Sequence, residues 1–140
     1  MEIKNAVIES TKISMADHDI LTITVFVKGD GWCCGIGGYL NGIGHIDATE
    51  WKGNGSAIVA MMKIMDVVGV TNWDDLPGKH IRVKIGKPGE TVDEIGNIIK
   101  DKWFNLRKFY EKDTGQATFV FKEKEENDEQ MNYDYNYESF

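Results

Sequence analysis

Residues 20–40 read ILTITVFVKGDGWCCGIGGYL, and this stretch decides the fold class. Residues 20–27 are rich in β-branched and aromatic side chains, which favour a strand. Residues 28–31, KGDG, contain Gly and Asp, which tolerate the positive φ of a hairpin turn. Residues 32–40 then return as a second strand. The stretch predicts a β-hairpin within an antiparallel sheet.

Further strand signals lie on both sides of this hairpin. Residues 3–13 alternate roughly between apolar and polar side chains. Residues 79–85, KHIRVKI, alternate between basic and apolar ones, which is typical of a half-buried strand. The other elements that we expect are strands over 91–99 and 117–121, a short helix over 104–111, and a loop over the glycine-rich residues 41–54.

Residues 57–68, AIVAMMKIMDVV, predict a helix that is apolar nearly all round. Ser56 is the expected N-cap and Gly69 the expected C-cap residue. Only Lys63 and Asp66 interrupt the apolar surface, so either a curved sheet or a partner subunit must cover it. The predicted fold is α+β, with an antiparallel β-rich core, one apolar helix and a short C-terminal helix, in an oligomer.

The length of 140 residues and the composition, 41% hydrophobic and 28% charged, predict one globular domain. We expect this β-rich domain to span residues 1–121 and an acidic, flexible tail to span residues 122–140. No apolar run approaches the ~20 residues of a membrane-spanning helix, and no leader pattern opens the chain. The adjacent Cys33 and Cys34 match no metal-binding spacing. We therefore expect an intracellular protein with reduced thiols.

The same sequence contains no pattern that predicts catalysis. The glycine-rich residues 29–44 match neither a phosphate-binding loop nor a dinucleotide fingerprint. His18, His45 and His80 are isolated in sequence, and packing or surface roles are the simpler interpretation. We expect no enzyme activity, no cofactor and no metal ion.

The segment 79–121 differs from the rest of the chain in its charge. It carries nine Lys and Arg against six Asp and Glu, although the whole chain has a net charge of -7. Cations beside flat aromatic rings suit a ligand that has both phosphates and a base. A solvated basic strand face with aromatic anchors is the alternative, and the pattern alone slightly favours it. The candidate ligand-binding residues are Arg82, Asn97, Lys100, Trp103 and Phe104.

Several motifs, taken in order along the chain, resemble those of one phage-encoded family. The motifs are ADHDILT at 16–22, GIGGY at 35–39, GSA through VGV over 55–70, WDDLPGKHIRV at 73–83 and IGNIIKDKWFN at 95–105. Through them, residues 2–110 resemble the phage Thoeris anti-defence sponges. Members of that family share a β-rich core with accessory helices and assemble into dimers and higher oligomers, up to hexamers.

The resemblance implies sequestration of a signal without chemistry. Such sponges bind glycocyclic ADP-ribose, which a bacterial immune TIR enzyme makes, and keep it from its effector. Some also bind cyclic di- or trinucleotides in separate pockets. For this chain the resemblance implies a cytoplasmic protein of an infected bacterium whose ligand residues are the five named above. The loop 41–54 and the acidic tail depart from the family pattern.

Two other functions compete with this interpretation. A phage single-stranded DNA-binding protein would also have a β-rich core, aromatic residues and an acidic tail, here ending in Phe140. Against it, residues 57–68 are very apolar and the basic residues are few for a groove that follows a polymer. An enzyme that degrades a nucleotide is weaker still, because no acid-base or metal cluster is recognisable.

Overall fold

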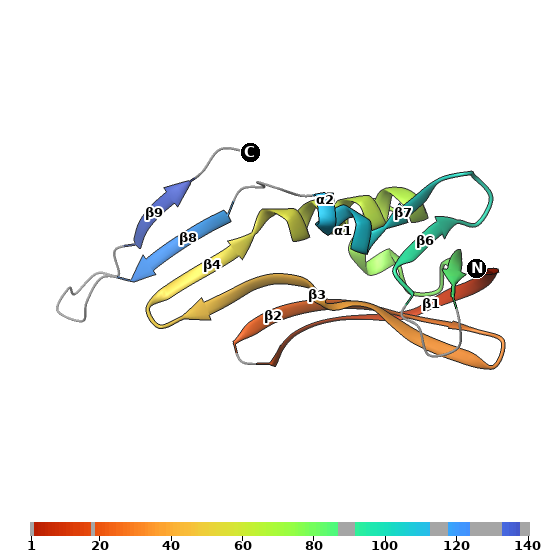
Figure 1. Cartoon of the computed structure of the whole chain (residues 1–140), viewed down its shortest axis with the longest axis horizontal. Coiled ribbons are helices and arrows are strands. Elements are labelled where there is room, and N and C mark those ends of the chain that lie inside the picture. The colour runs from red at the N-terminus through yellow and green to blue at the C-terminus, as the bar shows by residue number, and fades with distance from the viewer. Residues whose placement is uncertain (1, 18, 87–91, 113–117, 124–132, 138–140) are drawn as a thin grey trace.

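The computed structural model describes residues 2–17, 19–86, 92–112, 118–123 and 133–137. They form an α+β fold in which an antiparallel sheet curves into a half-barrel and two helices accompany it (Figure 1). The strand order is β7-β6-β5-β1-β2-β3-β4-β8-β9. The elements are β1 Glu2–Asp17, β2 Ile20–Gly29, β3 Trp32–Asp47, β4 Glu50–Asn54, α1 Gly55–Val68, β5 His80–Ile85, β6 Glu94–Asn97, β7 Trp103–Asn105, α2 Leu106–Lys112, β8 Thr118–Glu123 and β9 Tyr133–Tyr137.

The hairpin predicted from residues 20–40 is confirmed. β2 pairs with β3 in antiparallel register, with Val25 opposite Ile36 and Gly29 opposite Trp32. Gly31 in the turn has φ of 76°, a conformation that glycine adopts without strain. Along residues 23–27 of β2 every second residue is buried, so the pleat of the strand sets which side chains meet the core.

The loop predicted over residues 41–54 is wrong. β3 continues through Asp47, and β4 returns beside it with Ile46 opposite Trp51. Gly37 and Gly38 have positive φ, and the register between β2 and β3 shifts there, which lets the strand bend and continue. Backbone pairing with two neighbouring strands holds this segment. A glycine-rich strand of this kind carries almost no hydrophobic signal in its sequence.

The predicted apolar helix is confirmed as α1, but its N-cap is Asn54 and not Ser56. The Asn54 Oδ1 accepts a hydrogen bond from the Ser56 backbone N–H at 3.1 Å, while Ser56 is buried inside the first turn. Gly69 is the C-cap, as predicted: it has φ of 92°, and its N–H donates to the Met65 carbonyl at 2.8 Å.

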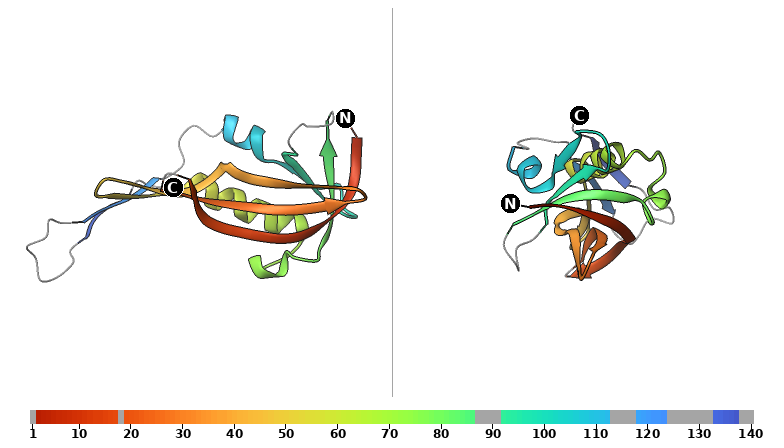
Figure 2. Two further views of the ribbon diagram at one scale, coloured as in Figure 1. Left: turned by 90° about the horizontal axis from the view of Figure 1, so that it is seen from below. Right: turned by 90° about the vertical axis from the view of Figure 1, so that its right-hand side faces the viewer.

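Helix α1 lies against the concave side of the sheet (Figure 2). The buried core brings one face of the helix together with the inward side chains of the long strands, among them Ile8, Val25 and Ile81. The opposite face stays open, because a half-barrel wraps only one side, and Met62 there is 63% exposed. The curved sheet therefore covers part of the apolar helix surface and leaves the rest uncovered.

The segment after α1 returns to the sheet as β5, β6 and β7. β5 matches the strand predicted over residues 79–85 to within one residue. β6 is shorter than the strand predicted over 91–99, of which residue 91 lies outside the described residues. The helix predicted over 104–111 begins two residues late, because residues 103–105 pair with β6 as strand β7. Its first turn is capped by Asn105, whose Oδ1 accepts from the Lys108 N–H at 2.9 Å.

The last described strands extend the sheet beyond β4. β8 pairs with β4, and β9 pairs with β8, both in antiparallel register. β8 covers most of the strand predicted over 117–121, and residue 117 lies outside the described residues. Within the predicted acidic tail, residues 122–123 belong to β8 and residues 133–137 form β9. The remainder of that tail lies outside the described residues.

Candidate functional site

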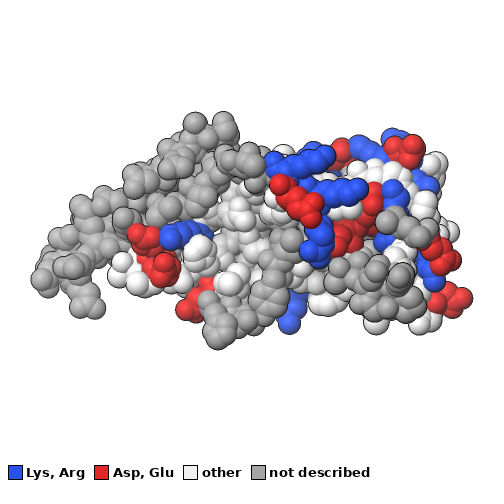
Figure 3. Space-filling view, viewed as in Figure 1, with Lys and Arg blue, Asp and Glu red and all other residues white. Residues whose placement is uncertain are grey.

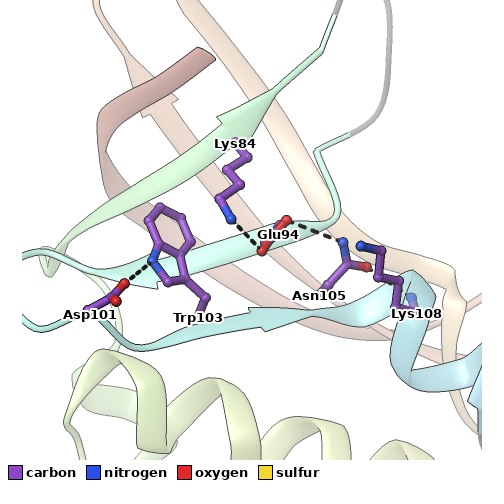
Figure 4. A network of polar contacts seen from close by, with 6 residues as sticks. All are labelled: Lys84, Glu94, Asp101, Trp103, Asn105 and Lys108. Atoms are coloured by element: carbon purple, nitrogen blue, oxygen red, sulfur yellow. Dashed lines mark hydrogen bonds and ion pairs between the residues drawn. The ribbon is translucent and has the colours of Figure 1, made fainter. Parts of the chain in front are cut away.

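The β5–β6–β7 end of the sheet brings most of the candidate residues together. Side chains on alternate positions of these strands share one face, so cross-strand partners form rows. Two rows lie on the outer face: Arg82, Gly96 and Trp103 form one, and Lys84, Glu94 and Asn105 form the other. Figure 4 shows how Trp103 and the second row lie close together.

Trp103 lies across a glycine and beside two cations. A Cβ added to Gly96 would come within 2.5 Å of the indole ring, so only glycine leaves room for it. The Arg82 guanidinium carbon lies 4.8 Å and the Lys84 ammonium 4.4 Å from the ring centroid. The indole Nε1–H donates to the Asp101 carboxylate at 3.0 Å. These contacts set the orientation of the ring.

Asn97 and Arg82 hold the turn between β6 and β7. The Asn97 side chain donates from Nδ2 to the Val67 carbonyl at 2.8 Å, and its Oδ1 accepts from the N–H groups of Ile99 and Lys100. Arg82 donates to the carbonyls of Asn97 at 2.7 Å and Lys100 at 2.8 Å. The Asn97 amide is thus engaged with the backbone at both ends. Its position favours a role in shaping the turn over direct contact with a base.

Phe104 lies apart from the other candidates on the inner face of the sheet. It is the cross-strand partner of the buried Ile95 and is itself only 8% exposed. Its ring meets that of Phe109 edge to face, with the centroids 5.5 Å apart. Phe104 therefore belongs mainly to the core, and only part of it reaches the wall of the cavity next to β7.

This cavity of about 380 Å³ lies where β7, α1 and α2 meet. Its size falls in the range of small-molecule sites, roughly 300–1,000 Å³. Aromatic residues and three lysines, which come from the two helices, line it. The lining residues are Lys63, Trp103, Phe104, Asn105, Lys108, Phe109 and Lys112.

The three cavity lysines have no ion-pair partner among the described residues, in contrast to two other lysines nearby. Lys84 pairs with Glu94 at 2.9 Å and Lys102 with Asp66 at 2.8 Å. A hydrogen bond from Arg107 to the Asp93 carboxylate raises the pKa of that guanidinium. Figure 3 shows basic side chains gathered over α2 and the neighbouring end of the sheet, with acidic ones among them. Positive charge outside ion pairs therefore lies at the cavity, and also at Arg82 and Lys100 beside it, for which the described residues hold no carboxylate partner either.

Lys63, Lys108 and Lys112 were not among the predicted site residues. Lys63 was visible in the sequence as one of the two interruptions of the apolar helix. Lys108 and Lys112 are four residues apart, so they lie on one face of a helix. Nothing in the local sequence shows that this face meets Lys63, because that depends on how α1 and α2 pack.

Two other hollows lie at the β3–β4 hairpin. The larger, about 610 Å³, has His45 and Lys52 in its wall, and the smaller, about 270 Å³, is lined mainly by apolar side chains such as Trp51. Lys52 is paired with Asp47 at 3.7 Å and with Glu50 at 3.2 Å. Its charge is therefore balanced, and the hollows at this hairpin suit an anionic ligand less well than the cavity at β7 does.

Other chemistry has little support in the part of the chain that the structure describes. No group of three or more His, Cys, Asp or Glu side chains there could hold a metal ion. Cys33 is exposed. Partial burial of Cys34 raises the pKa of its thiol, and the neighbouring Cys33 raises that pKa further, by a smaller amount. His18 lies outside the described residues. No helix among those described is both long and apolar enough to cross a bilayer.

Comparison of the chain with protein-family models, with curated proteins and with solved structures found no match.

Proposed function

We propose that the protein is a phage anti-defence sponge that binds glycocyclic ADP-ribose and holds it without degrading it, so that the Thoeris effector is not activated. The motif resemblance over residues 2–110 is the starting point. The observation that carries the proposal is the cavity at β7, where lysines without ion-pair partners among the described residues lie beside aromatic rings. Cyclic di- or trinucleotides of related immune systems belong to the same class of ligand.

The chemistry of this cavity matches the two parts of such a ligand. Phosphate groups accept charge-assisted hydrogen bonds from Lys63, Lys108 and Lys112. A base can stack on an aromatic ring such as that of Trp103, a contact worth ~1–3 kcal/mol per base. A sponge needs tight binding and no turnover, and nanomolar affinity corresponds to about -12 kcal/mol. Cations and aromatic rings beside one open cavity supply both kinds of contact.

We also propose that the protein assembles into a homo-oligomer through the uncovered face of α1. Ile58 and Met62 on this helix are 47% and 63% exposed, and Ile99 in the turn after β6 is 87% exposed. Side chains of this size favour burial against a partner. A Met62→Asp variant should shift the mass measured by light scattering toward that of the monomer. A wild-type protein that is monomeric at micromolar concentration would contradict the assembly.

A release experiment tests sequestration. The purified protein is mixed with glycocyclic ADP-ribose, freed of unbound ligand and heated, and the released fraction is tested for activation of the Thoeris effector. We expect intact signal to be recovered. A new product in place of the signal would instead show an enzyme. Binding to oligo-dT with no binding of the cyclic nucleotide would show a single-stranded DNA-binding protein.

A further inference from the structure

The Glu94 carboxylate lies between two parts of the candidate site. The aromatic half is Trp103 with Arg82 and Lys84. The cationic half is the set of three cavity lysines, Lys63, Lys108 and Lys112. Glu94 lies in the middle of the outer row, between Lys84 on β5 and Asn105 on β7. Its Oε1 accepts from the Lys84 ammonium at 2.9 Å, and its Oε2 accepts from the Asn105 Nδ2 at 3.4 Å (Figure 4). The Glu94 side chain is 18% exposed, so both contacts are partly shielded from water.

The first contact reaches the aromatic half of the site. The ammonium that Glu94 holds also lies 4.4 Å from the centroid of the Trp103 ring. A lysine tail is flexible and loses rotamer freedom when it is held in one place. The carboxylate opposes that freedom, and it also places a negative charge beside the cation. Glu94 thereby keeps Lys84 over the indole ring.

The second contact reaches the cationic half. Asn105 is the N-cap of α2, because its Oδ1 accepts from the Lys108 N–H at 2.9 Å. The Nδ2 of the same amide donates to Glu94, which determines how the amide is turned. Helix α2 has seven residues, and Lys108 and Lys112 project from it into the cavity wall. The direction in which these lysines point therefore depends on a cap that Glu94 orients.

We propose that Glu94 is a positioning residue that sets the aromatic half and the cationic half of the site together. It contacts neither the cavity nor, on this view, the ligand, and its effect on the ligand rests on the proposed function. A carboxylate suits this role because it accepts two hydrogen bonds at once. Glutamine at the same position has only one acceptor oxygen, so it must turn its NH₂ group toward one of the two donors and lose that contact.

The free protein supplies the first test, without any ligand. In a ¹⁵N–¹H spectrum, Glu94→Gln should shift both the Trp103 indole resonance and the Lys108 amide resonance. Glu9→Gln is the matched control, because Glu9 forms an exposed ion pair with Lys28 at 3.8 Å on β1 and β2. A spectrum in which either of the two resonances stays at its wild-type position would overturn the proposal.

Binding of two probes supplies the second test. Inorganic pyrophosphate reports on the cations alone, and glycocyclic ADP-ribose reports on both halves. We expect Glu94→Gln to bind glycocyclic ADP-ribose about tenfold more weakly, although the substitution removes a negative charge, because the positions of Lys84, Lys108 and Lys112 are no longer set; the dependence of binding on salt should change as well. A loss of stability alone would lower the melting temperature and leave the salt dependence of the folded protein unchanged.

The outcomes separate this proposal from the proposed function. If the wild-type protein binds pyrophosphate but not glycocyclic ADP-ribose, the proposed sponge function is wrong. The role of Glu94 is then tested by pyrophosphate binding alone. Wild-type affinity and salt dependence in Glu94→Gln, for whichever probe binds, would overturn the role of Glu94. Binding of neither probe would overturn both proposals.

A double-mutant cycle checks the route through the helix cap. Asn105→Ser keeps a good N-cap and removes the Nδ2 donor to Glu94. If the carboxylate acts on the lysines through Asn105, the combined Glu94→Gln and Asn105→Ser variant should bind pyrophosphate no more weakly than the worse single variant. Additive losses would show that the two residues act independently, which contradicts the proposal.

Discussion

The β5–β7 end of the sheet and the β3–β4 hairpin contain similar residue types but differ in their charge balance. Each has a tryptophan, Trp103 or Trp51, and each borders a hollow with lysine in its wall. At the hairpin, Lys52 is paired with two carboxylates, and Trp51 is 47% exposed. At the β5–β7 end, two cations lie against the indole of Trp103, and the three cavity lysines have no carboxylate partner among the described residues. By its charge balance, the cavity at β7 is the better candidate for an anion, although it is not the largest of the three hollows.

Of the substitutions that test this comparison, removal of the two α2 lysines should have the largest effect on ligand binding. We expect Lys108→Ala combined with Lys112→Ala to weaken binding of glycocyclic ADP-ribose about a hundredfold, because two hydrogen bonds to a charged group are lost. Lys52→Ala at the hairpin is the control and should bind as the wild type does. Isothermal titration calorimetry measures both. Equal losses in the two variants would remove the distinction between the two ends.

The two tryptophans supply the next comparison. Trp103→Ala should weaken ligand binding by about 1–3 kcal/mol, the range for loss of one stacked base, and leave the oligomer intact. Trp51→Ala removes a ring that has no cation against it in the described structure, and we expect unchanged affinity. Calorimetry and light scattering on both variants test this. Unchanged binding in Trp103→Ala would exclude that ring from the site.

Asn54 and Asn97 bind the two ends of α1, and their substitution compares how much each contributes to the free energy of unfolding. Asn97→Ala loses three hydrogen bonds, including the one to the Val67 carbonyl, and should lower the free energy of unfolding by about 2 kcal/mol. Asn54→Ala loses the N-cap of α1 and should cost about 1 kcal/mol. Urea unfolding measures both. Wild-type stability of Asn97→Ala would contradict the role of Asn97 in holding this turn.

Two glycines give the smallest expected effects. An added Cβ at Gly96 would meet the Trp103 ring, so Gly96→Ala should displace the indole and weaken ligand binding about fivefold, less than removal of the ring. At Gly44 the Cβ would lie 2.9 Å from the Lys52 carbonyl oxygen, a backbone atom. Gly44→Ala should therefore cost about 1 kcal/mol of stability and leave binding unchanged. Calorimetry measures binding and urea unfolding measures stability. Weaker ligand binding in Gly44→Ala together with wild-type binding in Gly96→Ala would contradict the assignment of the site to β7.

The sequence predicted those parts of the fold that have a local signal. The β-branched and aromatic content of residues 20–27, the alternation in residues 79–85 and the apolar run of residues 57–68 are each a property of one element. Residues 41–54 gave no such signal, because glycines pair through their backbone and have little side chain to bury. Residues 104–105 were predicted as helix but belong to β7, because their pairing with β6 is a contact made after a turn.

The candidate site was predictable only in part. Charge and aromatic content pointed to the segment 79–121, and the structure brings Arg82, Asn97, Lys100 and Trp103 close together there. The buried position of Phe104 depends on which face of β7 meets the core, and a three-residue strand is too short to show it.

By itself the sequence determined the strand and helix periods, the apolar helix and the basic segment, because these depend on neighbours along the chain. Only the tertiary structure decided which cations remain unpaired and which rings they meet. Lys63 reaches the cavity from α1, and Lys108 and Lys112 reach it from α2. The packing of those helices against β7 depends on the whole core. Charge balance in three dimensions is a property of that packing, and no local pattern encodes it.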